Sequence, residues 1–331
     1  MKNNVVIQGK DLCIGYRTGK KEKCVHKHLS FELCAGELTC LLGANGAGKS
    51  TLLRTLSGSQ PALNGKLMVN GNLLSQLSEK ERSRTIGVVL TDKTFAGGLS
   101  VYELVALGRQ PHTGFFGRLH KEDHRIIKEA LENVGIAHKA QSYTAELSDG
   151  ERQKVMIAKA LVQECPLILL DEPTAFLDVV SRIEIMQLLH RLAIEQNKAI
   201  LLSTHDIEQA LVLADKLWLL TKGKGLQCGV TEDIILNHHM DELFVHKDIC
   251  FDYDHGVYYP TVIGTKRITV ESTDKTLLHW CMNALNRHGY QCVPHECNEK
   301  LTAVSPNKLQ WTDLNGTETY SSFEELIAKR C

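Results

Sequence analysis

The sequence lacks any apolar run long enough for a membrane-spanning helix. Hydrophobic residues make up 43% of the 331 residues, but runs such as Leu167–Leu170 and Ala199–Leu202 meet charge within a few positions, far short of the ~18 residues a span needs. The start of the chain, MKNNVVIQGKD, has an apolar stretch of only three residues, so we expect no signal peptide. If the protein works at a membrane, it must dock there on another protein.

The chain also has almost no net charge. Lys and Arg number 38 and Asp and Glu number 39, giving a formal net charge of −1. A chain so close to neutral has no overall field that would attract nucleic acid or an anionic membrane, and we expect no nucleic-acid partner. Internal repeats, low-complexity tracts and long heptad runs are absent. The length and ordinary globular composition predict one large domain and a smaller one.

Cysteine is plentiful but has no disulfide or metal pattern. The 11 cysteines are scattered and odd in number, which favours reduced thiols in a cytosolic protein. The group Cys292, His295 and Cys297 fits no common zinc spacing. Iron or haem sensing is an alternative for this group and for His238 and His239 with His246. We expect these groups to serve packing or solvation.

Apolar runs that alternate with helical patterns predict an α/β fold. Leu167–Leu170 and Ala199–Ser203 are continuous apolar runs separated by the helical stretch Ser181–Gln196, as expected for a parallel sheet covered on both faces. Nearer the N-terminus we expect short strands interrupted by a polar loop, Arg17–Lys23, and a further strand over Thr85–Leu90.

The composition changes towards the C-terminus. Residues His238–Gly264 are rich in His, Asp and Tyr without periodicity, which indicates a linker or irregular strands. From Lys266 the pattern restarts with strands and two helices, predicting a small α+β domain. Its β-α-β-β-α order is similar to small ferredoxin-like regulatory folds.

A phosphate-binding loop is the strongest motif. Residues 43–50 read G-A-N-G-A-G-K-S and match G-x-x-x-x-G-K-[ST] between an apolar strand and a helical pattern. The glycines allow backbone N–H groups to surround phosphate oxygens at a helix N-terminus, Lys49 reaches the β- and γ-phosphates, and Ser50 ligates Mg²⁺. We therefore expect a nucleoside triphosphate and Mg²⁺ as ligands, and the family resemblance given below implies that the nucleotide is ATP. The candidate nucleotide-binding residues here are Gly43, Ala44, Asn45, Gly46, Ala47, Gly48, Lys49, Ser50 and Thr51.

Two carboxylates end the later apolar run. Asp171 and Glu172 follow Leu167–Leu170 directly, where open α/β sheets place ligand-binding groups. We expect Asp171 to hold Mg²⁺ and Glu172 to act as the general base that polarises the attacking water.

Between these motifs, Leu147-Ser148-Asp149-Gly150-Glu151 resembles the signature sequence of ATP-binding cassette (ABC) ATPases, and His205 in Ser203-Thr204-His205-Asp206 completes that family's motif order. The resemblance implies an α/β P-loop ABC ATPase core, with a parallel sheet, an antiparallel β subdomain and a helical subdomain, followed by a small C-terminal α+β domain. The expected boundaries are 1–240 for the nucleotide-binding domain with its helical subdomain at about 92–163, 241–264 for a linker, and 265–331 for an accessory, regulatory or dimer-stabilising domain.

The family pattern also implies roles for single residues. Tyr16 resembles the aromatic residue that stacks on adenine. Ser148 and Gly150 would contact the γ-phosphate held by a second copy of the chain, so the hydrolysing unit would be a homodimer. His205 resembles the switch histidine that holds Glu172 and water, and Asp178 the residue that couples the two sites.

The run E-L-V-A-L-G-R-x-P-H, from Glu103 to His112, resembles the subgroup that powers import of iron(III)–siderophore complexes, haem and cobalamin. This implies a peripheral ATPase on the cytoplasmic face of the bacterial inner membrane, with permease subunits and, indirectly, a substrate-binding protein as partners. Two alternatives remain at this stage: a soluble ABC ATPase not coupled to transport, and a weakly catalytic ATP-binding regulator.

One departure generates a prediction. Family members have a glutamine after the strand near Leu90, where it touches Mg²⁺ or the lytic water, whereas this chain has Thr91, a shorter hydrogen-bonding group that is a candidate for the same contact. We expect retained but weak basal ATP hydrolysis. Phosphate release from purified protein should exceed that of Glu172→Gln; equal turnover in the two proteins would show that Glu172 has no catalytic role.

Overall fold

The computed structural model describes residues 4–19, 21–90, 98–114, 117–244, 249–261, 264–295 and 297–330. The chain forms two compact units, one comprising Met1–Val245 with Tyr253–Val257 and the other His246–Asp252 with Tyr258–Cys331. Each unit is described by itself.

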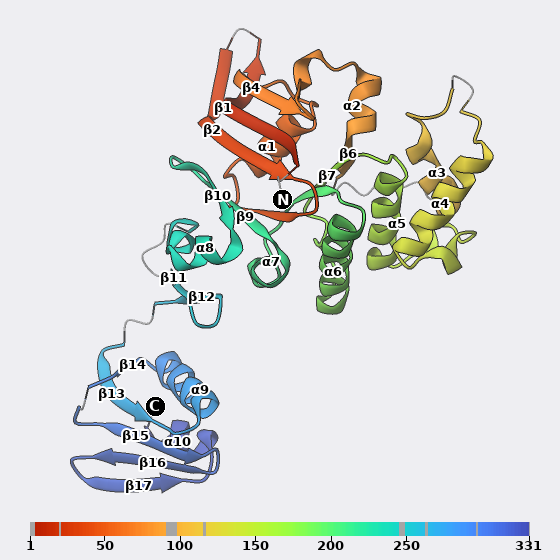
Figure 1. Cartoon of the computed structure of the whole chain (residues 1–331). Coiled ribbons are helices and arrows are strands. Elements are labelled where there is room, and N and C mark those ends of the chain that lie inside the picture. The colour runs from red at the N-terminus through yellow and green to blue at the C-terminus, as the bar shows by residue number, and fades with distance from the viewer. Residues whose placement is uncertain are drawn as a thin grey trace. The chain divides into compact units, whose positions relative to one another are not determined.

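A six-stranded sheet forms the centre of the first unit (Figure 1). Its strands β3, β8, β7 and β6 are parallel, as is β9 beside β3, and β10 is antiparallel at one edge. The central strands are mainly apolar and almost fully buried, with Thr39, Ser203 and the partly buried Asp171 as their polar residues, as expected for a sheet covered on both faces. In spatial order the strands are β10 (Gly225–Val230), β9 (Lys216–Thr221), β3 (Leu38–Leu42), β8 (Ala199–Ser203), β7 (Leu167–Asp171) and β6 (Ile86–Val89).

The two faces of this sheet are covered differently. Helices α6 (Val179–Glu195) and α7 (Ile207–Leu213) pack against β3 on one face. On the other side lie α1 (Lys49–Leu56) and a four-stranded antiparallel sheet (Figure 1). The short helix α8 (Thr231–Leu236) follows β10.

The antiparallel sheet has the order β2-β1-β4-β5. Its buried side chains share one core with the central sheet, in which the Phe31 and Trp218 rings lie 4.7 Å apart. The expected polar loop Arg17–Lys23 is wrong, because the strands continue to Thr18 and resume at Lys21. The strand bounds are β1 (Val5–Thr18), β2 (Lys21–Cys34), β4 (Asn64–Val69) and β5 (Asn72–Leu73).

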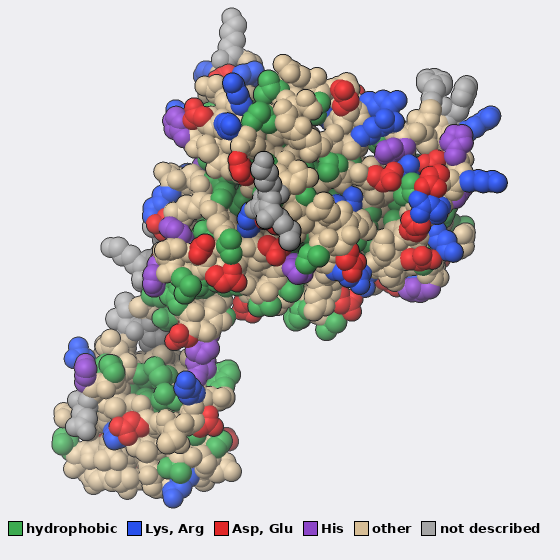
Figure 2. Space-filling view, in the orientation of Figure 1, with side chains coloured by type: hydrophobic (Ala, Val, Ile, Leu, Met, Phe, Trp, Pro, Cys, Tyr) green, Lys and Arg blue, Asp and Glu red, His purple; other side chains and the backbone are tan. Residues whose placement is uncertain are grey.

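Helices form a separate layer beyond β6. Serine N-caps with glutamate three residues later start α2, α3 and α5, each as a reciprocal capping box, a device that satisfies free N–H groups at a helix start. Figure 2 shows side chains of both charges interspersed over this layer. The α-helices of this layer are α3 (Val101–Ala106), α4 (Lys121–Asn133) and α5 (Asp149–Leu161), whereas α2 (Glu79–Thr85) leads into β6 and contacts it. The short 3₁₀ turns of the first unit are η1 (Leu74–Gln76), η2 (Leu107–Arg109), η3 (Ala137–Lys139), η4 (Thr144–Glu146) and η5 (His239–Glu242).

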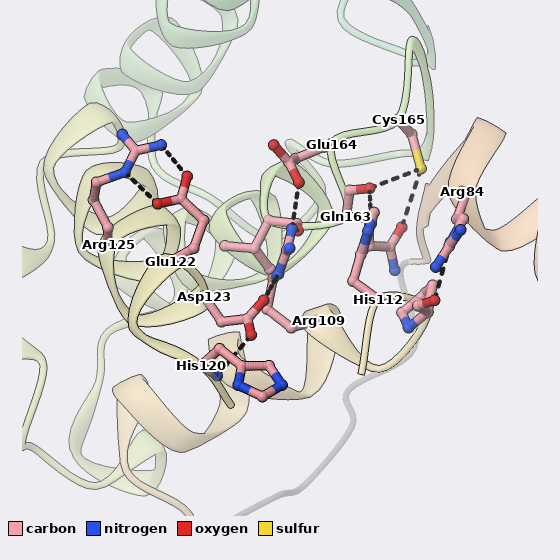
Figure 3. Close-up of polar contacts among 12 residues, drawn as sticks. Arg84, Arg109, His112, His120, Glu122, Asp123, Arg125, Gln163, Glu164 and Cys165 are labelled. Carbon is pink, nitrogen blue, oxygen red and sulfur yellow. Dashed lines mark hydrogen bonds and ion pairs between the residues drawn. The ribbon is translucent and has the colours of Figure 1, made fainter. Parts of the chain in front are cut away.

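A buried arginine ties these helices together (Figure 3). Arg109 is 5% exposed; its guanidinium donates to Asp123 Oδ1 at 2.8 Å, to the Val162 carbonyl at 2.7 Å and to Glu164 Oε2 at 2.6 Å. A hydrogen bond from the His120 N–H, assisted by Arg109, lowers the pKa of Asp123, although burial opposes the shift. Arg109, on η2, therefore joins the start of α4 to the end of α5.

The second unit has its own sheet and core. Strands are ordered β14-β13-β15-β16-β17, with α9 (Lys275–Arg287) and α10 (Phe323–Arg330) packed on them around the fully buried Trp311. The expected ferredoxin-like arrangement is wrong: β13 lies directly beside β14, parallel to it, whereas that fold inserts a strand between the two. The bounds are β13 (Lys266–Glu271), β14 (Tyr290–Val293), β15 (Lys300–Ser305), β16 (Lys308–Asp313) and β17 (Gly316–Tyr320).

Two further strands, β11 (Ile249–Asp252) and β12 (Val257–Pro260), pair only with each other. Within the described ranges, the helices are too short or too polar to cross a bilayer.

The buried arginine gives a stability prediction. Replacing Arg109 by alanine leaves Asp123 buried without its partner, and we expect the free energy of unfolding to fall by about 3–5 kcal/mol. The matched control is Arg125→Ala, which removes only exposed pairs with Glu122 and Glu129 and should cost less than about 1 kcal/mol. Urea unfolding followed by circular dichroism compares the two; equal losses would contradict the structural role of Arg109.

Candidate nucleotide-binding and catalytic site

The phosphate-binding motif forms the turn between β3 and α1. Gly46 and Gly48 have φ values of 75° and 104°, in the left-handed region that favours glycine. At Gly43 a Cβ atom would lie 2.6 Å from the Leu220 carbonyl oxygen, so a side chain there would clash with β9. Residues 45–51 line a cavity of about 500 Å³.

Lys49 is held inside this turn by groups of the protein. Its Nζ donates to the Gly43 carbonyl at 2.7 Å and lies 3.3 Å from Nε2 of His205. Burial lowers the pKa of the Lys49 ammonium, and the nearby carboxylates of Glu172 and Asp171 oppose that shift. A polyphosphate in the cavity would offer the ammonium a stronger partner than one carbonyl.

The two carboxylates lie at the end of β7, fixed by Ser203 on β8. The Ser203 hydroxyl donates to Asp171 Oδ1 at 2.6 Å, and the Glu172 N–H donates to Ser203 Oγ at 3.0 Å and to its carbonyl at 3.1 Å. Glu172 has a φ of 47°, a left-handed conformation that an ordinary residue adopts only when held in place. Ser203 was not predicted as a site residue.

His205 joins the carboxylate to the phosphate loop. Its Nε2 lies 2.8 Å from Glu172 Oε1, and with Lys49 it completes a chain of polar contacts. Lys49, Glu172 and His205 come from three places far apart in the sequence, and the structure brings them to one cavity wall.

The β1–β2 hairpin forms the opposite wall. The Tyr16 hydroxyl contacts Thr51 Oγ1, and the Tyr16 side chain is 40% exposed, so its ring is available to a ligand. Across the hairpin, Tyr16 pairs with Lys23, and Nε2 of the buried His26 lies 2.6 Å from the Ala47 carbonyl oxygen.

Several cavity residues were missed by the sequence analysis. They lie on β2 and after β9, and no local motif marks them. The pairing of β2 with the strand of Tyr16 is the one signal that could have indicated the residues on β2. These residues are Lys23, Cys24, Val25, His26 and Lys222.

The predicted residues Ser148, Gly150 and Asp178 do not line this cavity. Ser148 caps α5 by accepting from the Glu151 N–H, with Gly150 in the first turn. Asp178 caps α6 by accepting from the backbone and hydroxyl of Ser181. Thr91 lies outside the described residues.

The cysteine and histidine groups show no metal-binding arrangement in the described part of the chain. Cys297 Sγ donates to the Glu299 carbonyl and contacts the Thr269 hydroxyl. The His238 ring packs edge-on against Tyr253, and His246 lies outside the described residues.

Two family models match the chain. Residues 26–175 match the model described as ABC transporter. Residues 265–329 match the model described as the iron ABC transporter C-terminal domain.

Individual relatives agree with these matches. The chain is 36% identical over 247 residues to the iron(3+)-hydroxamate import ATP-binding protein FhuC of Bacillus subtilis, covering 71% of this chain and 92% of the relative. It is 36% identical over 238 residues to the ferric enterobactin transport ATP-binding protein FepC of Escherichia coli, covering 72% and 86%. Among solved structures, the dimeric post-hydrolysis ATP-binding cassette MJ0796 with ADP and Pi matches with a TM-score of 0.59 and 27% identity over 68% of this chain and 98% of that one.

The lowered pKa of Lys49 generates a pH prediction. An anionic ligand binds best to the charged ammonium, so ATP affinity should be full below the pKa of Lys49 in the free site and fall as the pH rises through it. Titrating a fluorescent ATP analogue from about pH 8 to about pH 10.5 tests this range, which approaches the ordinary lysine value. Lys49→Arg stays charged throughout, so its affinity, relative to its own starting value, should stay level. A parallel decline in both proteins would exclude Lys49 as the titrating group.

Proposed function

The chain belongs to the ABC transporter family of ATP-binding proteins, and from this premise we propose that it is the ATP-hydrolysing subunit of an importer for an iron(III)–siderophore, haem or cobalamin type of cargo. One observation carries the ATPase part: the cavity that brings the phosphate loop, Tyr16, Glu172 and His205 together. The names of the relatives and the iron-transporter model over residues 265–329 support the cargo class.

The residues of the cavity divide the chemistry between them. Tyr16 would stack on adenine, and the N–H groups of residues 43–51 would bind the phosphates together with Lys49. Glu172 would orient and polarise the attacking water, while His205, whose Nε2 lies 2.8 Å from Oε1 of that carboxylate, would hold it towards the γ-phosphate. Ser203 would keep both carboxylates at the end of β7.

The donor set of this site fits Mg²⁺. Ser50 offers a hydroxyl and Asp171 a carboxylate, which are the hard oxygen ligands that this cation prefers. When bound, the ion would neutralise charge on the phosphates. Thr91 is a further candidate for the same region.

A second copy of the chain would complete each site. Ser148 and Gly150 lie at the start of α5, outside the cavity of their own chain. They would contact the γ-phosphate held by the partner, and Asp178 would couple the two sites. The dimeric cassette structure to which this chain is similar supports this assembly.

Transport would require a membrane partner. We propose that the helical layer, at about 92–163, receives permease subunits on the cytoplasmic face of the inner membrane, with a substrate-binding protein acting on the permease. The exposed apolar side chains Leu107 and Tyr143, 52% and 55% exposed, support docking on that layer. Residues 1–240 would form the ATPase domain and 241–264 a linker, and 265–331 would regulate it or stabilise the dimer.

Co-purification from native membranes tests the transport function. Glu172→Gln with Mg-ATP should hold the closed dimer and retain a polytopic permease, identified by mass spectrometry after detergent extraction. Lys49→Ala, which loses the phosphate contact, is the control for nucleotide dependence, and Leu107→Asp should reduce recovery by placing a charge on the docking face. Recovery of only soluble proteins with Glu172→Gln would overturn the transport function and favour an ABC ATPase that acts elsewhere.

A further inference from the structure

Two cysteine sulfurs touch beside the nucleotide cavity. Sγ of Cys13, on β1, lies 3.0 Å from Sγ of Cys24, on β2. Cys24 is exposed and lines the cavity, whereas Cys13 is partly buried. Neither thiol has a part in the proposed ATPase chemistry.

The strand pairing explains why the two sulfurs meet. On β1 and β2, Ile14 pairs with His26 but the next residue, Gly15, pairs with Cys24, so the register shifts by one residue at this point. Such a bulge changes the direction of side chains on the longer strand. It brings Cys24 towards Cys13 at the position next to the Tyr16–Lys23 pair.

This part of β2 also presses on the phosphate loop. Cys24 Sγ donates to the His26 carbonyl at 3.3 Å, and the His26 ring contacts the Ala47 carbonyl. A Cβ atom added to Gly48 would lie 2.9 Å from Val25 Cγ1. A movement of Cys24 would therefore reach the phosphate loop through the next two residues.

We propose that Cys13 and Cys24 form a reversible intrachain disulfide, a modification site at the edge of the nucleotide cavity that takes peroxide or a low-molecular-weight disulfide as its oxidant. With peroxide, the Cys24 thiolate attacks one oxygen, giving a sulfenic acid and releasing hydroxide. The Cys13 sulfur then attacks the Cys24 sulfur, and the hydroxyl leaves as water with the Cys13 proton. Two thiols lose two electrons and one peroxide becomes two waters.

The environments of the two thiols support this order. Cys24 is open to solvent, where an oxidant reaches it first. Burial, with a contribution from Cys24 itself, raises the pKa of the Cys13 thiol to about 11, so Cys13 stays protonated and is not the first thiol to be oxidised. By contrast Cys34, Cys40, Cys165 and Cys281 are buried.

The effect on nucleotide binding depends on the proposed function. A disulfide needs its sulfurs about 2 Å apart, so oxidation must draw Cys24 towards β1. The backbone there is already close: a Cβ atom on Gly15 would lie 2.8 Å from Cys24 Cα. The strain should therefore displace the neighbouring Tyr16 from its contact with Thr51, and we expect the Kd for ATP to rise by about threefold to tenfold, the range for loss of one aromatic contact.

Peptide mapping of the full chain tests the disulfide directly. After limiting hydrogen peroxide, alkylation and trypsin, Cys13 lies alone in the peptide Asp11–Arg17 and Cys24 alone in Cys24–Lys27. The expected product is these two peptides joined, two hydrogens lighter than their sum, and separated again by dithiothreitol. Alkylated Cys13 alongside a singly oxidised Cys24, or Cys24 joined to another peptide, would overturn the proposal.

Nucleotide affinity is measured on the same samples. The oxidised protein should bind a fluorescent ATP analogue more weakly, and reduction should restore the affinity. Cys13→Ser and Cys24→Ser should lose this response. The control Cys250→Ser, which removes a partly buried thiol of the other unit, should keep it. An unchanged Kd in a fully joined sample would overturn the effect on binding. Failure of the reduced protein to bind ATP would instead contradict the proposed function, and the mapping would still decide the disulfide.

Discussion

The position of Ser203 at the end of β8 is the constraint on which the site depends. This residue pairs with Leu41 of β3 on one side and with Asp171 of β7 on the other, so the ends of three parallel strands meet at one level. The phosphate loop leaves from the first strand, both carboxylates from the third, and His205 lies two residues beyond Ser203 itself. Because the Ser203 side chain is fully buried and bonded to Asp171 and to the Glu172 N–H, it fixes the direction of the Asp171 carboxylate and the backbone position of Glu172.

The polar groups of the site contact one another. Lys49 turns back onto the Gly43 carbonyl, and His205 Nε2 lies 2.8 Å from Glu172 Oε1. A ligand must therefore replace both contacts at once, which a polyphosphate can do and a single apolar or cationic group cannot. The left-handed backbone of Glu172, which costs about 1–3 kcal/mol, persists because two hydrogen bonds to Ser203 hold it. These contacts fix the shape of the site, so the binding of a ligand requires little further ordering of side chains.

The sequence predicted the central strands well and the edges poorly. The run Leu167–Leu170 and the run Ala199–Ser203 are apolar, short and sharply bounded, and they correspond to β7 and β8 almost residue for residue. The end of the β1–β2 hairpin was misassigned because its residues are polar and exposed on both strands, which leaves no alternation to detect. The strands β4, β14 and β17 were also not predicted; β17 is polar and exposed up to Tyr320, so it too lacks an alternation to detect. Within the site, the contact of His26 with Ala47 depends on where a distant hairpin folds, and no local pattern encodes that.

The hydrogen bonds and ion pairs of Arg109 limit how the helix α5 can move. This helix of 13 residues is about 20 Å long, starts at the Ser148 cap and ends where Arg109 grips the Val162 carbonyl. A helix anchored at one end by a buried ion pair and capped at the other moves as a stiff rod and stores little energy in bending. If Ser148 is displaced by a few ångströms, the other end of α5, beside Leu107, should therefore move by nearly the same distance. In this way α5 can transmit movement between the two ends of the helical layer.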